Sequence, residues 1–205
     1  VQTCALPISK IADILCQKEL INESDKEIYA FGYEVIFDNV TKLIAIFLAG
    51  VILHKTIITL IFLITFVSLR GYTGGYHAKS KWICGLVSFL LWGLVVGSTG
   101  YVTEVLKTNK VIIFFMVLVS ELIIHQYAPV ENINKRLTEE KRLRNRRRAI
   151  VLGMIYGILI LLLTFITTEY GVAMAMTILE VAILMIIPNE GRVNHEETEC
   201  FRKNC

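Results

Sequence analysis

One short polar segment between two long apolar runs carries the residues that can do chemistry. Residues 70–84, Arg-Gly-Tyr-Thr-Gly-Gly-Tyr-His-Ala-Lys-Ser-Lys-Trp-Ile-Cys, place His77 seven positions before Cys84. A thiolate is the reactive form of cysteine, and a nearby imidazole can remove the thiol proton and later protonate a leaving group. These two residue types therefore predict nucleophilic acyl-transfer chemistry of the kind that thiol proteases use.

The spacing of these two residues requires the chain to bend. On one straight helix, positions seven apart share a face, but their Cα atoms would be separated by roughly 10.5 Å. A hydrogen bond between imidazole and thiol needs about 3 Å. Gly74 and Gly75 allow a bend, because glycine adopts backbone conformations that other residues avoid. We also expect the start of the following helix to favour the Cys84 thiolate through its partial positive charge.

Arg70 is a candidate to bind a substrate carboxylate or an oxyanion through charge-assisted hydrogen bonds. Ordinary interpretations also exist for each residue of the segment. A single cationic residue or histidine at the end of an apolar run is a common interfacial anchor, and a single cysteine near a helix start is a common small buried residue. On the residues alone, both interpretations stay open.

The composition indicates that membrane helices surround this segment. Of the 205 residues, 55% are hydrophobic, and the mean hydropathy is +0.60, which is too apolar for an ordinary soluble domain. Continuous rather than alternating apolar runs favour helices over a barrel. Because roughly 20 apolar residues cross a bilayer core, we predict an all-α, polytopic transmembrane helix bundle of about six spans (four to six). These lie near residues 31–53, 55–69, 83–103, 110–129, 149–168 and 170–188, and the second is short.

The distribution of charge predicts the orientation. Segment 131–148 carries eight lysines and arginines against three glutamates, and we interpret it as a basic cytoplasmic loop by the positive-inside rule. Counting spans places the predicted catalytic loop, residues 70–84, on the same cytoplasmic side. Contact with anionic lipid headgroups is the simplest role of the basic loop, and recognition of an acidic substrate segment is a second one. Nucleic-acid binding is disfavoured, because no aromatic residues are interleaved with the cations.

The chain divides into three parts. Residues 1–28 form an N-terminal segment with an amphipathic helix, which we expect either on the membrane surface or packed on the bundle. Residues 29–188 form a single transmembrane domain, and residues 189–205 form a polar tail. The chain begins at Val1 and shows no signal-peptide pattern in residues 1–7, so we expect a truncated or non-native start.

The cysteines and the acidic residues in the spans suggest no metal or cofactor. The five cysteines show no CxxC and no regular ligand spacing, so we predict neither a structural zinc site nor a disulfide framework.

Glu34 is a weak candidate to orient His77, with a helix-end residue as the simpler interpretation. Glu121 and His125 share one helical face and can hydrogen-bond each other, and Glu180 is similarly ambiguous between a polar path and internal packing.

At Arg70, at residues 74–78 (Gly-Gly-Tyr-His-Ala) and at Cys84, the sequence resembles the AgrB (accessory gene regulator B) family. This family comprises membrane cysteine endopeptidases of Gram-positive quorum sensing. Residues 31–34 (Phe-Gly-Tyr-Glu) are a secondary match, and the resemblance covers about residues 8 to 190. It implies a multi-pass protein of the cell membrane of a Gram-positive bacterium.

The resemblance also implies roles and partners. Cys84 would be the nucleophile and His77 its general base, with supporting roles for Arg70, Gly74 and Gly75. The partner would be a peptide precursor of the AgrD type, cleaved in its C-terminal part through a thioester on the enzyme and cyclised to a lactone or thiolactone signal. No cofactor is implied.

Two further expectations concern partners and rival functions. The family and the small residues of the third span are compatible with a homodimer through Gly93, Gly97 and Gly100. The alternative to an enzyme is a transporter subunit or sensor scaffold, for which Cys84 would be dispensable. Membrane metallopeptidases and thiol-redox proteins are disfavoured, because the sequence has neither HExxH nor CxxC.

Overall fold

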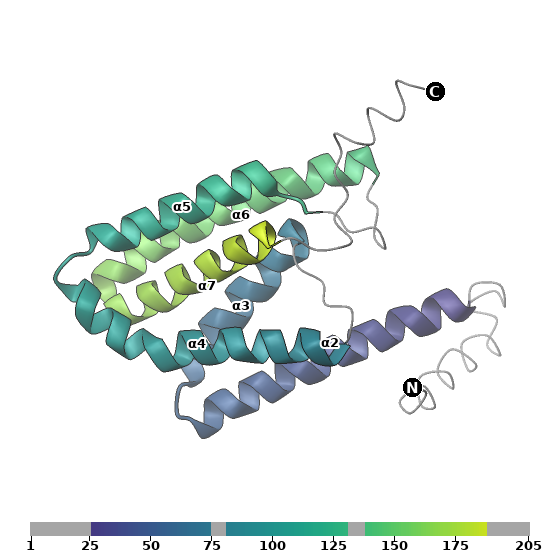
Figure 1. Ribbon diagram of the computed structural model, residues 1–205, viewed down its shortest axis with the longest axis horizontal. Helices are drawn as coiled ribbons and strands as arrows, with labels where there is room; N and C mark the ends of the chain where they lie inside the picture. The colour runs from purple at the N-terminus through teal and green to yellow at the C-terminus, as the bar shows by residue number, and fades with distance from the viewer. Residues whose placement is uncertain (1–25, 75–80, 131–137, 188–205) are drawn as a thin grey trace. The chain divides into compact units, whose positions relative to one another are not determined.

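The computed structural model describes residues 26–74, 81–130 and 138–187, and this part of the chain forms six α-helices (Figure 1). Their bounds are α2 (Lys26–Ile52), α3 (Thr56–Thr73), α4 (Lys81–Lys107), α5 (Val111–Tyr127), α6 (Glu139–Ile166) and α7 (Thr168–Ile186). Five of them are long and apolar enough to cross a membrane, while α5 is apolar but has only 17 residues. The predicted all-α transmembrane bundle is confirmed. The predicted amphipathic helix of residues 1–28 lies almost wholly outside the described residues.

The prediction of a short second span is wrong at its C-terminal end. Helix α3 does not stop at residue 69 but continues through Arg70 and Gly71 to Thr73, which makes it 18 residues long. One arginine and one glycine do not interrupt a helix whose other residues are mostly apolar. The helix ends at Gly74, which has φ +70° and whose N–H donates to the Arg70 carbonyl. A residue in this left-handed conformation cannot continue an α-helix.

The prediction of a basic loop over the whole of 131–148 is also wrong, for its second half. Helix α6 begins at Glu139, and eight of its first ten residues are charged before the apolar part begins. Arginine, lysine, leucine and glutamate are good helix formers, and no glycine or proline interrupts them. Glu139 and Glu140 in the first turn complement the helix dipole and pair with Arg142 and Arg144 at 3.5 and 3.6 Å.

Contacts between residues divide the chain into two units, Val1–Ala49 and Gly50–Cys205. In the second unit α7 is the central helix, because it packs against α3, α4, α5 and α6. Of its residues, 72% are buried, against 39% for α3 and 22% for α4. Small residues permit this close packing: a Cβ on Gly171 would meet the backbone of Thr164.

Two side-chain hydrogen bonds fix α3 within this unit. The indole Nε1 of Trp92 on α4 donates to Thr59 Oγ1 at 3.0 Å, and the hydroxyls of Ser68 and Tyr156 on α6 are 2.7 Å apart. One bond joins α3 to α4 and the other joins α3 to α6. They set the position of α3, whose last turn carries Arg70.

Candidate functional site

Arg70 and Cys84 lie at the facing ends of two successive helices in the sequence, the end of α3 and the start of α4. Arg70 lies in the last turn of α3 and Cys84 in the first turn of α4. The guanidinium and the thiol are close enough to interact electrostatically. Both residues therefore belong to helices. Cys84 lies within the predicted third span, and Arg70, predicted to follow the second span, lies inside α3. The connection between the helices, which contains Gly75 and His77, lies outside the described residues.

Cys84 has the surroundings of an accessible thiol at a helix start. Its sulfur is free and its side chain is half-buried. The 27-residue helix α4 begins three residues earlier, so the thiol lies near the partial positive charge of that helix end. The Cys84 carbonyl accepts a hydrogen bond from Ser88 Oγ at 3.0 Å, one turn further along the same helix.

Stacked aromatic rings orient the Arg70 guanidinium. Its Cζ lies 5.7 Å from the centroid of the Phe66 ring, and Phe66 in turn stacks on Phe62 with a centroid separation of 5.1 Å. Both rings are buried. A guanidinium over an aromatic face is held there by cation–π attraction. The guanidinium therefore has a packed aromatic base at the end of α3.

Gly74 is held by a segment from a distant part of the sequence. The Val130 N–H, after the end of α5, donates to the Thr73 carbonyl at 2.8 Å, and Gly74 and Val130 form an isolated parallel bridge. A Cβ on Gly74 would collide with the Val130 carbonyl oxygen, and its φ of +70° is strained for any other residue. This contact fixes the point at which the chain leaves α3 towards His77.

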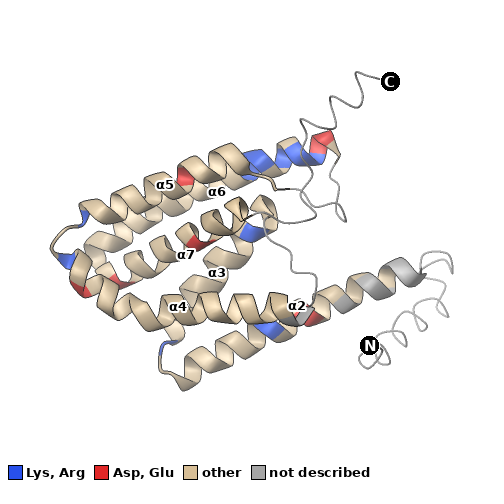
Figure 2. Cartoon of the chain, viewed as in Figure 1, with Lys and Arg blue, Asp and Glu red and all other residues tan. Residues whose placement is uncertain are grey.

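The basic part of α6 lies at the same end of the second unit. The Arg148 guanidinium is 5.7 Å from the centroid of the Tyr72 ring on α3, and Arg146 Nη2 donates to the His125 carbonyl at 3.4 Å. The cations of α6 gather near its N-terminal end, as Figure 2 shows. Basic residues thus adjoin the helix end that carries Arg70.

The other acidic candidates lie elsewhere. Helix α2 contains Glu34, whose side chain is outside the described part of the structure. Glu121 packs against Gly153 of α6, and its Oε1 is buried without a hydrogen-bond partner among the described residues, while His125 is exposed. Glu180 is buried on the central helix, and both its oxygens also lack partners there. None of the three supplies an observed partner for Cys84.

Sequence reasoning missed the residues that support the candidate site. The bridge from Val130 and the stack of Arg148 on Tyr72 join positions more than 50 residues apart, and no local pattern marks them. Phe66 is four residues before Arg70 on one helix face, which is a spacing that does indicate contact.

Comparison with known proteins gives the family. A model of the family described as Accessory gene regulator B matches residues 8–187. An AgrB-like protein of Clostridium perfringens is 29% identical over 158 residues, which are 73% of this chain and 72% of that protein. Accessory gene regulator protein B of Staphylococcus saprophyticus is 27% identical over 179 residues, 86% of this chain and 91% of that protein. No solved structure matches the chain. Because the family model spans most of its length, the chain belongs to the accessory gene regulator B family.

Proposed function

We propose that this protein is a membrane-embedded cysteine endopeptidase of the accessory gene regulator system. It cleaves the C-terminal part of an AgrD-type peptide precursor and promotes cyclisation of the remainder to a thiolactone or lactone signal. The observation that carries the proposal is the free, half-buried thiol of Cys84 at the start of α4, within electrostatic range of the Arg70 guanidinium. The six residues between Gly74 and the start of α4, residues 75–80, include the motif histidine, His77.

The first half of the reaction forms a thioester. His77 takes the thiol proton, and the Cys84 sulfur attacks a carbonyl carbon of the precursor. The oxyanion that develops is stabilised by the charge of Arg70, whose guanidinium donates in a fixed planar geometry. The C–N bond then breaks, His77 gives its proton to the leaving amine, and the C-terminal fragment departs. The remaining peptide stays bound to Cys84 as an acyl group.

The second half releases the signal peptide. A cysteine or serine of the bound peptide attacks the thioester carbonyl, its proton passes to His77, and the bond to Cys84 breaks. The ring forms without any further reactant. This attack is intramolecular, so proximity favours it over hydrolysis by water. A half-buried thiol at the end of a transmembrane helix limits the access of water to the acyl group.

The orientation follows from the charges. We place the end with Cys84 and the basic part of α6 in the cytoplasm, because cationic residues collect on that side of membrane proteins. The stack of Arg148 on Tyr72 supports a common location of the two regions. A precursor held on the inner membrane surface would meet Cys84 there. The proposal also includes a homodimer. Its support is that Gly93, Gly97 and Gly100 of α4 are exposed and could contact a second copy.

Co-expression with the precursor encoded nearest to this gene tests the proposal. Intact masses of peptide and protein are measured for the wild type, Cys84→Ser, His77→Ala and the matched control Cys200→Ser. We expect precursor cleavage to disappear in the first two variants and to persist in the control. The wild type should carry a peptide adduct that hydroxylamine releases. Normal processing by Cys84→Ser would contradict the enzyme and support a transporter subunit or sensor scaffold.

A further inference from the structure

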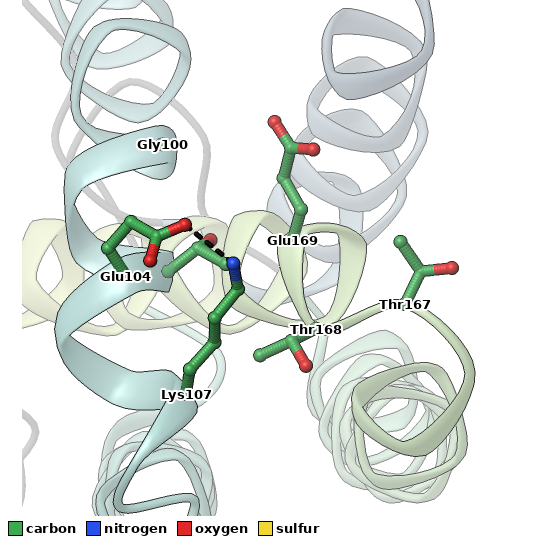
Figure 3. A pocket seen from close by; sticks show the side chains of 7 residues that line it. Gly100, Glu104, Lys107, Thr167, Thr168 and Glu169 are labelled. Atoms are coloured by element: carbon green, nitrogen blue, oxygen red, sulfur yellow. Dashed lines mark hydrogen bonds and ion pairs between the residues drawn. The ribbon is translucent and has the colours of Figure 1, made fainter.

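We propose that the end of the bundle opposite Cys84 binds a zwitterionic headgroup of the phosphoethanolamine type. A cavity of about 380 Å³ lies there between the last turns of α4 and the start of α7 (Figure 3). Its lining consists of Gly100, Thr103, Glu104, Lys107, Thr167, Thr168 and Glu169. On α4 these residues are at least 16 positions from Cys84, or roughly 24 Å at 1.5 Å per residue. The cavity is therefore separate from the candidate catalytic site.

Thr103 supplies a hydrogen-bonding group that the protein itself does not use. Its side chain lines the cavity and is 5% exposed, and its hydroxyl has no partner in the described structure. The neighbouring buried threonine on the same helix, Thr99, donates to the Val95 carbonyl one turn earlier. Buried hydroxyls are nearly always paired. A molecule that reached this hydroxyl from the cavity would supply the partner that it lacks.

One wall of the cavity attracts an anion. Lys107 contributes an ammonium group with three N–H donors, of which Glu104 accepts one. Helix α7 begins at this wall, and the Thr167 hydroxyl at its N-cap makes no capping bond. The start of this 19-residue helix, with its partial positive charge, therefore belongs to the same wall. A phosphate group fits this combination of lysine, hydroxyl and helix start.

The other lining charges attract a cation. Glu104 and Glu169 bring two carboxylates to the cavity, and the Glu104 side chain is exposed while that of Glu169 is half-buried. An anion alone would be repelled by them. A ligand that carries an ammonium group beside its phosphate satisfies both signs of charge, and the primary ammonium of ethanolamine can also donate hydrogen bonds to carboxylates.

The position of the cavity at the membrane surface indicates the source of such a ligand. Lysines gather at this end: Lys55 pairs with Glu169 at 3.5 Å, and Lys110 donates to the Thr164 carbonyl at 3.2 Å beside the Phe165 ring. Charged residues at the ends of apolar helices lie at the depth of lipid headgroups. Phosphatidylethanolamine presents the required chemistry there, and soluble phosphoethanolamine presents it in water.

Native mass spectrometry of the full chain in detergent tests this inference with defined lipids. The protein is titrated with phosphatidylethanolamine, phosphatidylcholine and phosphatidylglycerol of equal chain length. We expect phosphatidylethanolamine to be retained about tenfold more tightly than the other two, since one hydrogen bond to a charged group is worth about that factor. Phosphatidylcholine lacks the ammonium donors, and phosphatidylglycerol lacks the cation. Equal retention of all three lipids would overturn the proposal.

Variants assign the preference to the cavity. Thr103→Val and Lys107→Gln should each remove most of it, while Thr103→Ser should keep it. The matched control is Thr99→Val, one turn earlier on α4, whose hydroxyl bonds its own helix. Melting temperatures identify any variant that fails to fold. A preference for phosphatidylethanolamine that survives in Thr103→Val and Lys107→Gln would contradict the site. Competition by soluble phosphoethanolamine at low concentration would show that the ligand is not a lipid. Cys84→Ser should bind as the wild type does, which separates this test from that of the peptidase.

Discussion

The two ends of helix α4 are joined to the rest of the protein in different ways. At its start, Cys84 lies within electrostatic range of Arg70 on α3, and a backbone bridge between Gly74 and Val130 fixes the end of α3. At its end, Lys107 lines a cavity at the turn between α6 and α7, and its observed partner is an exposed carboxylate on its own helix.

This difference matches the demands on each end. Covalent chemistry needs reacting groups held within about 0.5 Å, which backbone hydrogen bonds and buried rings can provide. Reversible binding needs side chains that can exchange one partner for another, and exposed ion pairs are worth only about 0–1 kcal/mol. The start of α4 is therefore suited to catalysis and the end of α4 to exchangeable contacts.

The most damaging change to the first end is Gly74→Ala. A Cβ at this position would collide with the Val130 carbonyl oxygen, and the positive φ would be strained. We expect precursor processing to fall about 100-fold, because misplacing reacting groups by about 1 Å has an effect of that size. The lipid preference of the opposite end should not change. Processing is measured as the rate of precursor cleavage in proteoliposomes.

Gly71→Ala is the matched control for that experiment. Gly71 belongs to the same helix and nothing lies within 4 Å of a Cβ built there. Alanine is the better helix former, so this variant should process the precursor normally and be slightly more stable. Equal losses in the two variants would show that α3 tolerates no change, and that the bridge to Val130 has no special importance.

The contrast between these two glycines shows where sequence-based prediction succeeds and fails. The apolar runs predict the helices, because continuous hydropathy is a local property of the chain. The motif residues predict the chemistry, because their types limit the reactions available. Whether a helix ends at residue 69 or at Thr73 depends on Gly74, and the reason for its conformation is a contact with Val130, 56 positions later. No local pattern reveals that contact.

The same limit applies to the charged regions. The sequence predicts a basic loop at 131–148. The second half of this segment is instead helical, because ion pairs from Glu139 and Glu140 reinforce good helix formers. The cavity near Lys107 had no signal at all in the sequence. Its two walls come from segments about 60 residues apart, and only the packing of α7 against α4 brings them together.

The second-largest effect is expected from Arg70→Gln. Loss of a guanidinium within electrostatic range of Cys84 should lower the rate of thioester formation about tenfold or more, since it removes a positive charge that stabilises the oxyanion in the proposed mechanism. Arg70→Lys should recover part of the rate, because lysine retains the charge but not the planar donor geometry. Rates of adduct formation, followed by mass under single-turnover conditions, give the comparison. Arg144→Gln removes an exposed charge from α6 and serves as the control. An equal loss of rate in that variant would mean that general electrostatic attraction of the substrate, rather than Arg70, sets the rate.

A smaller effect is expected in the middle of the bundle. Tyr156→Phe removes the hydrogen bond to Ser68, whose hydroxyl keeps a bond to its own helix at Ile64. Bonds of this kind in membrane proteins contribute about 0.6 kcal/mol on average. We therefore expect a small loss in the free energy of unfolding, measured by denaturant in mixed micelles, with processing unchanged. Tyr101→Phe alters an exposed tyrosine on α4 and should have no effect.

The smallest effect is expected at the far end, from Lys55→Gln. Its ion pair with Glu169 spans 3.5 Å between two partly exposed side chains, so we expect it to contribute about 0.5 kcal/mol or less. A double-mutant cycle with Glu169→Gln isolates the pair, and raising the salt concentration to about 1 M should abolish it. A coupling energy well above 1 kcal/mol that persisted in salt would mean that this end of the bundle is as firmly fixed as the other. The distinction between a fixed catalytic end and an exchangeable binding end would then have to rest on the Gly74 bridge alone.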